Sequence, residues 1–333
     1  MKIAHNLKFD RSMLLNMGVS VLEPVADTML MSFVLDPTRS HSLDNLSKSQ
    51  LGIEKIKIKD LFKNFKTKKM EEVPLEEIAR YAVEDSDCCL KLYEKFEGEL
   101  KKEGLFHIYK DIEIPFSLVL ESMERKGVLL DLEHLKNLSG YLEEKTLGLE
   151  KEIYELSGEE FNIASPKQLQ VILYEKLKVH EKLGITKLKK TKTGFSTDVS
   201  MLDLLSEEPI VGKILEYRSL TKLKSTYVDA LPKQVSSTTG RVHTSFHQAG
   251  TGTGRLSSSD PNLQNIPIRS TLGQKVREAF IAKEGYELIS ADYSQVELRV
   301  MAHFAREDVL QKAFTEKKDI HAITASKVFG IEE

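Results

Sequence analysis

The chain has 333 residues, of which 41% are hydrophobic and 30% charged, and a formal net charge of -3. This length and apolar content exclude a disordered chain and favour two or three domains. No run of eighteen apolar residues occurs, and the first twenty residues include polar groups such as Asp10, so we expect a soluble, cytoplasmic protein with no membrane partner.

The first long helix is predicted over residues 75–100, where apolar residues recur at helical spacing between charged ones. These apolar positions are Ile78, Ala82, Leu90 and Phe96. The only two cysteines, Cys88 and Cys89, lie in this helix. Adjacent cysteines are poorly placed for a structural disulfide, which favours a reducing compartment.

Two further helices are predicted over residues 112–125, ended by Gly127, and 132–156. The next helix begins with Ser165 as N-cap, followed by Pro166, and Gln168 is expected to reach back as the partner of a capping box. Its apolar stripe consists of Leu169, Ile172, Leu173 and Leu177.

Two lysine-rich stretches are candidates for contact with phosphates. Residues 187–194 (KLKKTKTG) include Lys189 and Lys190 and are predicted to form an exposed loop, and residues 55–69 contain seven lysines. More broadly, residues 161–260 carry fifteen Lys and Arg against nine Asp and Glu. A basic middle region suits a polyanion-binding surface, although solvated charged loops and ordinary charge scatter explain the same counts.

After Pro232 the composition changes, because Ser, Thr and Gly dominate residues 236–259 and residues 241–246 are β-prone. We expect a new domain there. Near the end, residues 286–291 are predicted to form a strand that leads into Asp292, and residues 296–305 a helix. An Asp at the tip of a strand suits Mg²⁺ binding, but it is also a common helix-capping residue.

Several long motifs resemble family A DNA polymerases of the bacterial DNA polymerase I type. The run LISADYSQVELRVMAHFA (288–305) resembles their motif A, and TGRLSSSDPNLQNIPIR (253–269) resembles the preceding palm stretch. AHNLKFD (4–10) and YAVEDSD (81–87) resemble two motifs of their 3'-5' exonuclease domain. Supporting matches are FNIASPKQL (161–169), LEYRSLTKLKSTYVDALP (215–232) and DIHAITASKVFG (319–330).

The resemblance implies an enzyme, a DNA-directed DNA polymerase of replication or repair, whose partners are a DNA primer-template and dNTP. Asp292 and the carbonyl of Tyr293 would bind Mg²⁺ in a two-metal site for nucleotidyl transfer. Arg255 and His321 would lie near the primer terminus or the incoming nucleotide, and Arg269 would be a palm arginine. For His321, a surface helix residue is the plain alternative.

Glu297 resembles the steric gate that favours deoxynucleotides over ribonucleotides. Because Ser294 and Glu297 also have the spacing of a capping box, a purely structural role is an alternative. Three amide side chains would contact template, primer or minor groove independently of sequence: Asn262, Gln264 and Asn265.

In the exonuclease motifs, Asp10 and Asp85 resemble metal-binding carboxylates and Tyr81 the residue that orients the attacking water. Tyr81 and Asp85 are four residues apart, hence on one helix face, and a structural tyrosine with a solvated Asp remains the alternative.

The implied fold is α+β and multidomain. We expect a truncated RNase H-like 3'-5' exonuclease domain (1–100), a helical thumb (101–232), a partial palm with an antiparallel sheet and motif A (233–312) and the start of the fingers (313–333). Further carboxylates needed for both metal sites are expected outside this sequence, so we expect weak or absent proofreading and a fragment inactive without its missing C-terminal half. The rivals are a non-catalytic DNA-binding protein and a stand-alone 3'-5' nuclease.

Overall fold

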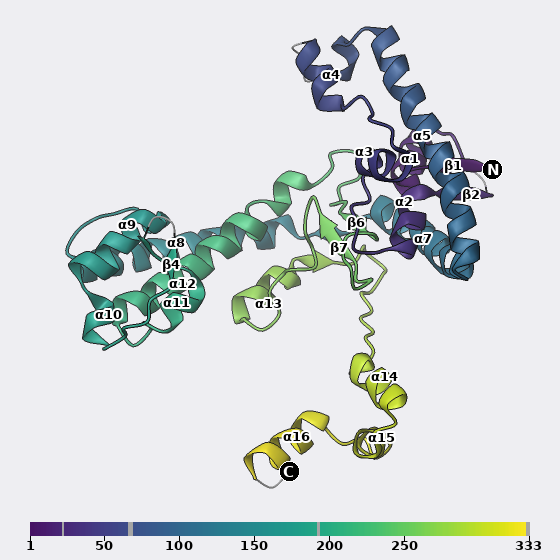
Figure 1. The fold of residues 1–333 in the computed structure, drawn as a ribbon. Helices are drawn as coiled ribbons and strands as arrows, with labels where there is room; N and C mark the ends of the chain where they lie inside the picture. The colour runs from purple at the N-terminus through teal and green to yellow at the C-terminus, as the bar shows by residue number, and fades with distance from the viewer. Residues whose placement is uncertain (22, 66–68, 192–193, 331–333) are drawn as a thin grey trace. The chain divides into compact units, whose positions relative to one another are not determined.

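The structure is a computed structural model that describes residues 1–21, 23–65, 69–191 and 194–330. The chain divides into two compact units, a main unit, Met1–Ile281, and a C-terminal unit, Ala282–Glu333. The described strands form two-stranded sheets among many helices, so the chain is of mixed α and β class (Figure 1). Within these ranges, no helix combines the length and the apolar character that crossing a membrane requires.

Residues 1–108 form the first part of the main unit around a parallel strand pair and a long helix. Strand β1 (Lys2–Ala4) pairs with β2 (Val25–Asp27), and α2 (Thr28–Leu35) packs along α5 (Leu75–Lys102). The other elements are α1 (Leu7–Asn16), α3 (Leu43–Leu46), η1 (Ser47–Leu51), α4 (Ile58–Asn64), η2 (Met70–Glu72) and α6 (Phe106–Ile108). Their shared core includes Leu30, Met31, Leu92, Phe96 and Leu100.

A buried carboxylate, Asp27, begins two of these helices. Its oxygens accept from the backbone N–H groups of Leu7 (2.8 Å) and Asn6 (3.1 Å) at the start of α1, and of Met29 (2.8 Å) at the start of α2. Burial raises the pKa of Asp27 even though these hydrogen bonds favour the charged form. The residue therefore ties α1 to the β2–α2 junction.

Residues 109–130 connect this part to the next through η3 (Tyr109–Glu113), α7 (Ile114–Lys126) and β3 (Leu129–Leu130). Helix α7 ends at Gly127, as predicted, with φ 59° and ψ -178°. A Cβ at this position would lie 2.7 Å from the carbonyl oxygen of Val242. Only glycine suits this backbone conformation and this close approach.

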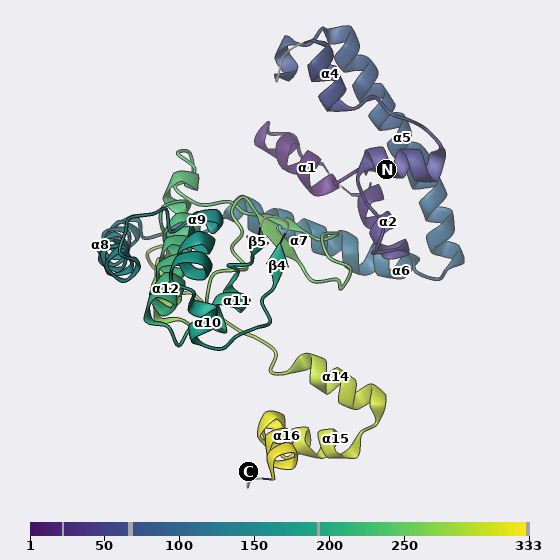
Figure 2. The same ribbon diagram turned by 60° about the vertical axis from the view of Figure 1, so that its left-hand side comes forward.

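Two helices that run alongside each other, α8 (Leu132–Ser157) and α12 (Pro209–Leu223), dominate the middle of the main unit (Figure 2). Small elements pack near one end of the pair: α9 (Pro166–Gln170), η4 (Val171–Lys176), α10 (Val179–Lys182), β4 (Lys190–Thr191), β5 (Gly194–Phe195) and α11 (Val199–Asp203). Their core contains the predicted stripe residues Leu169, Ile172 and Leu173, with Leu177 partly buried against it.

The last part of the main unit follows through η5 (Lys224–Val228) and η6 (Leu231–Gln234). Strands β6 (Ser245–His247) and β7 (Ser257–Ser259) pair antiparallel, and after α13 (Thr271–Glu278) strand β8 (Phe280–Ile281) pairs antiparallel with β3. A core that combines Leu135, Leu138 and Leu142 of α8 with Val242 and Val276 holds this part to α8.

The C-terminal unit contains α14 (Val296–Ala305), α15 (Asp308–Thr315) and α16 (Ile320–Phe329). Among its described residues only Ala302, Ala313 and Ile320 are buried. Large apolar side chains, including those of Ile289 and Phe304, are exposed. This unit therefore has very little core of its own.

The helix predictions for residues 75–100, 132–156 and 296–305 are confirmed within two residues at each end. Ser165 is the N-cap of α9, but the Gln168 side chain accepts from Asn162 N (2.7 Å), so the predicted capping box is wrong in its second bond. The predicted strand over 286–291 is also wrong. Its backbone is irregular, because no strand among the described residues pairs with it and an unpaired strand leaves its backbone groups without partners.

Candidate nucleic-acid interface

The motif that carries Asp292 and Tyr293 lies in the C-terminal unit, immediately before α14. Both residues are exposed on irregular backbone, and Tyr293 retains 84% of its accessible surface. The carboxylate of Asp292 is thus open to solvent and is neither sealed in a core nor at the tip of a strand. The expected placement at the tip of a strand is therefore wrong.

Glu297 is exposed near the start of α14. The N-cap is Gln295, with no side-chain cap, and Ser294 lies one residue outside the helix. The carbonyl of Ser294 accepts instead from Arg299 Nε at 2.9 Å. The structural alternative for Glu297, a capping box with Ser294, is therefore wrong.

His321 is exposed at the start of α16. Its backbone N–H donates to the side chain of Asp319 (2.8 Å), the N-cap of this helix. Its imidazole therefore lies on the outer surface of the C-terminal unit.

The predicted palm contacts lie on loops of the main unit, and all of them are exposed: Arg255, Asn262, Gln264, Asn265 and Arg269. The side-chain oxygen of Asn262 accepts from the N–H groups of Gln264 (3.1 Å) and Asn265 (3.3 Å). Asn262 therefore shapes this turn and presents the side chains of Gln264 and Asn265 to solvent.

The predicted lysine-rich loop is a short hairpin formed by β4 and β5, and residues 192–193 lie outside the described residues. Lys189 pairs with Asp198 at 2.7 Å, and the ammonium of Lys190 lies 5.8 Å from the ring centroid of Phe195. Both lysines are exposed, as predicted. Because one is already paired, the hairpin is less cationic than its sequence indicates.

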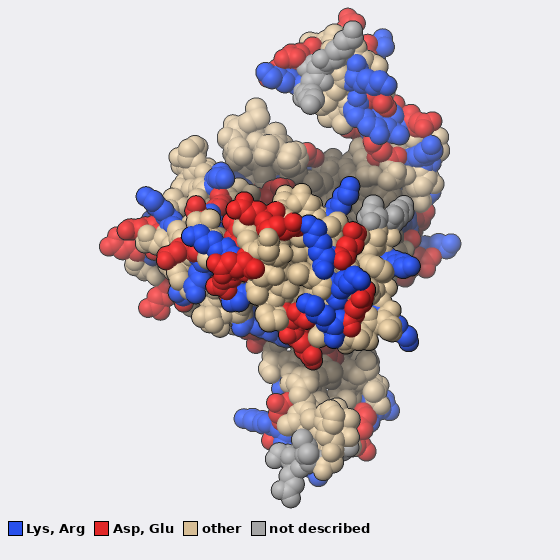
Figure 3. Space-filling model, turned by 90° about the vertical axis from the view of Figure 1, so that its left-hand side faces the viewer, with Lys and Arg blue, Asp and Glu red and all other residues tan. Residues whose placement is uncertain are grey.

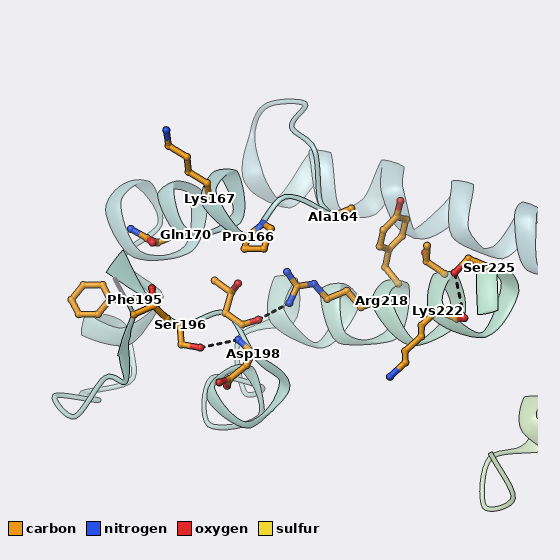
Figure 4. A pocket seen from close by; sticks show the side chains of 14 residues that line it. Ala164, Pro166, Lys167, Gln170, Phe195, Ser196, Asp198, Arg218, Lys222 and Ser225 are labelled. Atoms are coloured by element: carbon orange, nitrogen blue, oxygen red, sulfur yellow. Dashed lines mark hydrogen bonds between the residues drawn. The ribbon is translucent and has the colours of Figure 1, made fainter. Parts of the chain in front are cut away.

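A pocket of about 680 Å³ lies beside this hairpin, between α9, α12 and the loop after β5 (Figure 4). Arg218 points into it and donates to the carbonyl of Thr197 at 2.5 Å, while Lys167 and Lys222 extend outward from its rim. Burial lowers the pKa of Arg218 below its usual value. Sequence reasoning did not single out these three cations, although the motif at residues 215–232 contains Arg218 and Lys222.

Charges of both signs are interspersed on the face of the molecule that includes this region (Figure 3). Lys213 of α12 pairs with Glu152 of α8 at 2.6 Å, in the same way that Lys189 pairs with Asp198. On this face the described Lys and Arg residues are therefore interspersed with Asp and Glu, and they form no large basic patch there. Local cation groups, such as the one around the pocket, are the better candidates for contact with phosphates.

The exonuclease-type motifs place Tyr81 and Asp85 on one face of α5, as predicted. Asp85 pairs with the buried ammonium of Lys55, which also lies 5.3 Å from the ring centroid of Tyr81. Burial raises the pKa of Tyr81, and the nearby Asp85 raises it further.

Asp10 lies on α1 with much of its surface exposed. Partial burial of its carboxylate, together with the Asp27 carboxylate, raises its pKa. Its neighbours Lys8 and Arg11 fasten α1 to α7, since Lys8 pairs with Glu124 and Arg11 with Glu121 at 2.8 Å. Asp10 therefore lies on a firmly anchored helix.

Neither predicted set of metal ligands fits Mg²⁺ as it stands. Among the described residues, no group of three or more His, Cys, Asp or Glu side chains converges on a point that a metal ion could occupy. Asp292 and Tyr293 offer only a carboxylate and a backbone carbonyl from adjacent residues, which is fewer than the six oxygen ligands that Mg²⁺ takes. Asp85 already faces an ammonium group.

Sequence models of two known families match the chain. DNA polymerase family A matches residues 132–333, and the 3'-5' exonuclease family matches residues 1–101. DNA polymerase I of Synechocystis is 45% identical over 335 residues, which cover 100% of this chain and 34% of that protein. Thermostable DNA polymerase I of Thermus aquaticus is 49% identical over 243 residues, which cover 72% of this chain and 28% of that protein.

The chain spans about a third of the length of these curated relatives. A solved structure, the POL domain of Pol1 from M. smegmatis in complex with DNA primer-template and dNTP, resembles it with a TM-score of 0.83. The identity is 33%, and the match covers 99% of this chain and 54% of that one.

Proposed function

The chain belongs to DNA polymerase family A, and on that premise we propose that it is part of an enzyme that extends a DNA primer on a template, using dNTP. The observation that carries this proposal is the exposed Asp292, set directly before α14 in a segment that resembles motif A. A solvent-accessible carboxylate at this point is free to contribute to a metal site. The solved relative in complex with primer-template and dNTP supports the same substrates.

The finer architecture follows from the same premise. We assign residues 1–100 to an RNase H-like exonuclease domain, 101–232 to the thumb, 233–312 to a partial palm and 313–333 to the start of the fingers. The separate core around Leu169 and Ile210 supports an independent thumb tip. The assigned palm spans both compact units, because they divide after Ile281.

Contact with DNA is assigned first to the cations around the pocket. Lys222 and Lys167 are exposed, and Arg218 is held in place by the carbonyl of Thr197. Such groups bind phosphates irrespective of base sequence, which suits a polymerase that must accept every base pair. The exposed Lys190, Gln264, Asn265 and Arg269 are assigned as further contacts.

For the chemistry, we propose that Asp292 and the Tyr293 carbonyl contribute oxygen ligands to a Mg²⁺ site that the described residues do not complete. Arg255 and His321 would place positive charge near the phosphates of primer or nucleotide, and Glu297 would crowd the sugar 2' position. The protein would act in DNA replication or repair in the cytoplasm.

Binding of a fluorescent primer-template by the chain tests this function at the level of the DNA interface. Lys222→Met is expected to weaken binding by about threefold to tenfold and to reduce the slope of log K against log salt by about 0.9, the loss of one phosphate contact. The matched control is Lys213→Met on the same helix, whose ammonium is already paired with Glu152. Equal effects of both substitutions would count against the assigned interface.

A second candidate function is a DNA-binding protein without catalysis. It is favoured by one observation: the described residues include no cluster of three or more side chains that could hold a metal ion. Primer extension by the chain together with the remaining polymerase sequence separates the two. Salt-dependent binding with no Mg²⁺-dependent extension under those conditions favours the rival.

A further inference from the structure

Lys55 is a buried charged side chain in a stretch whose other described lysines are exposed or half-exposed. Its side chain is 1% exposed, whereas Lys59, Lys63 and Lys69 of the same lysine-rich stretch are exposed. The prediction that this stretch contacts phosphates is therefore wrong for Lys55. A buried ammonium is tolerated only where anionic groups compensate for its lost hydration.

Three groups from two helices surround this ammonium. Asp85 of α5 pairs with it directly, Asp44 of α3 lies 3.1 Å away, and the ring of Tyr81 faces it with its centroid at 5.3 Å. Two carboxylates that reach one nitrogen atom converge on a single point, and this is the geometry that holds a cation. Aromatic faces add to the attraction.

The backbone beside Lys55 is held in place as well. The N–H of Ile56 donates to the side chain of Glu84, one residue before Asp85, at 2.7 Å. The segment is therefore anchored to α5 at two adjacent residues, Lys55 and Ile56.

We propose that Lys55 is a built-in cation that takes the place of a divalent metal ion at Asp44 and Asp85, so that this part of the exonuclease-type segment folds without metal. A metal ion at Asp85 would have to displace the ammonium, which would then be buried beside one carboxylate or driven into solvent with its backbone anchor broken. This inference does not depend on the polymerase assignment.

Binding of Mn²⁺ to the full chain, measured by the electron paramagnetic resonance signal of the free ion, tests the proposal. We expect the wild-type chain and the Asp85→Asn variant to bind Mn²⁺ equally weakly. Lys55→Met keeps the length of the side chain but removes its charge. This variant is expected to bind Mn²⁺ at least about tenfold more tightly than the wild-type chain does. That gain should disappear in Lys55→Met/Asp85→Asn.

Lys59→Met is the matched control, because Lys59 belongs to the same stretch but is exposed, and it should leave Mn²⁺ binding unchanged. Mn²⁺ binding by the wild-type chain that requires Asp85, or a folded Lys55→Met chain that gains no site, would overturn the proposal.

Thermal unfolding of Asp85→Asn keeps the proposal testable if Lys55→Met fails to fold. With Lys55 intact, loss of its closest carboxylate leaves a buried ammonium undercompensated, so the melting temperature of this segment is expected to fall by about 5 °C or more. An unchanged melting temperature would mean that the ammonium does not depend on Asp85 for compensation, and the proposal would fail.

Discussion

Asp85 and Asp292 are both carboxylates for which the sequence predicts metal binding, yet the two occupy opposite settings. Asp85 lies in the well-packed main unit and faces a buried lysine, whereas Asp292 lies in the C-terminal unit on exposed, irregular backbone. The comparison shows that a motif fixes the residue type while the packing around it decides what the carboxylate can bind. In a core the charge must be neutralised within the fold, but at the surface water keeps it available.

The two units also differ in how much each side chain contributes to stability. Leu142 of α8 is fully buried, while Val300 of α14 is 47% exposed. Leu142→Ala is expected to cost about 2–5 kcal/mol of unfolding free energy, because it leaves a cavity. Val300→Ala is expected to change it by no more than about 0.5 kcal/mol. Denaturant unfolding followed by hydrogen exchange measures both losses of unfolding free energy. Similar losses for the two substitutions would contradict the difference between the units.

Backbone constraint in the main unit can be tested at Gly127. Gly127→Ala is expected to cost about 3 kcal/mol of unfolding free energy, because the new methyl group meets the carbonyl of Val242 at a positive φ. Gly140 lies within α8 and has no neighbouring atom within 4 Å of a built Cβ. Gly140→Ala should therefore stabilise the chain by about 0.5–1 kcal/mol. Circular dichroism melting of both variants measures these changes in stability. A less stable Gly140→Ala variant, or a Gly127→Ala variant as stable as the wild-type chain, would contradict this account.

A partly buried histidine makes the stability of the main unit depend on pH. Burial lowers the pKa of His5 from 6.5 to about 4, although its hydrogen bond to the carbonyl of His41 acts in the opposite direction. Between these values the unfolded chain binds more protons than the folded chain, so the contribution is complete above about pH 6.5 and is lost as pH falls towards 4. The loss amounts to about 2–3 kcal/mol.

His5→Gln should flatten the fall in unfolding free energy between about pH 6.5 and 4, measured by urea titration at several pH values. Some slope should remain, because burial also lowers the pKa of His41. A slope identical to that of the wild-type chain would show that His5 is not buried in its neutral form.

Much of the fold could be predicted from local patterns. The helices over 75–100, 132–156 and 296–305 have strong apolar periodicity, and Gly127 and Ser165 mark helix ends through local chemistry. The strand over 286–291 could not be judged in the same way, because a strand depends on a partner that local sequence does not reveal.

For the candidate site residues, the sequence predicted the residue types better than the side chains that surround them. Nothing near Lys55 in the sequence distinguishes it from the six other lysines of its stretch, because Asp85 reaches it from thirty residues away. The role of Asp27 in capping α1 was missed for the same reason, since α1 precedes it by more than ten residues. Arg218 and Lys222 were overlooked because isolated cations on a helix usually belong to a solvated face.

The central claim, that Asp292 is a catalytic carboxylate of a family A polymerase, is tested most directly in a chimaera. In the Thermus aquaticus relative, the 243 matched residues would be replaced by those of this chain. The chimaera is expected to extend a primer with Mg²⁺ and dNTP, and Asp292→Asn to slow extension about 1000-fold or more, while Asp308→Asn at the exposed start of α15 leaves the rate unchanged. An Asp292→Asn chimaera that extends primers at the unsubstituted rate would contradict the claim, as would a folded, DNA-binding chimaera that does not extend them.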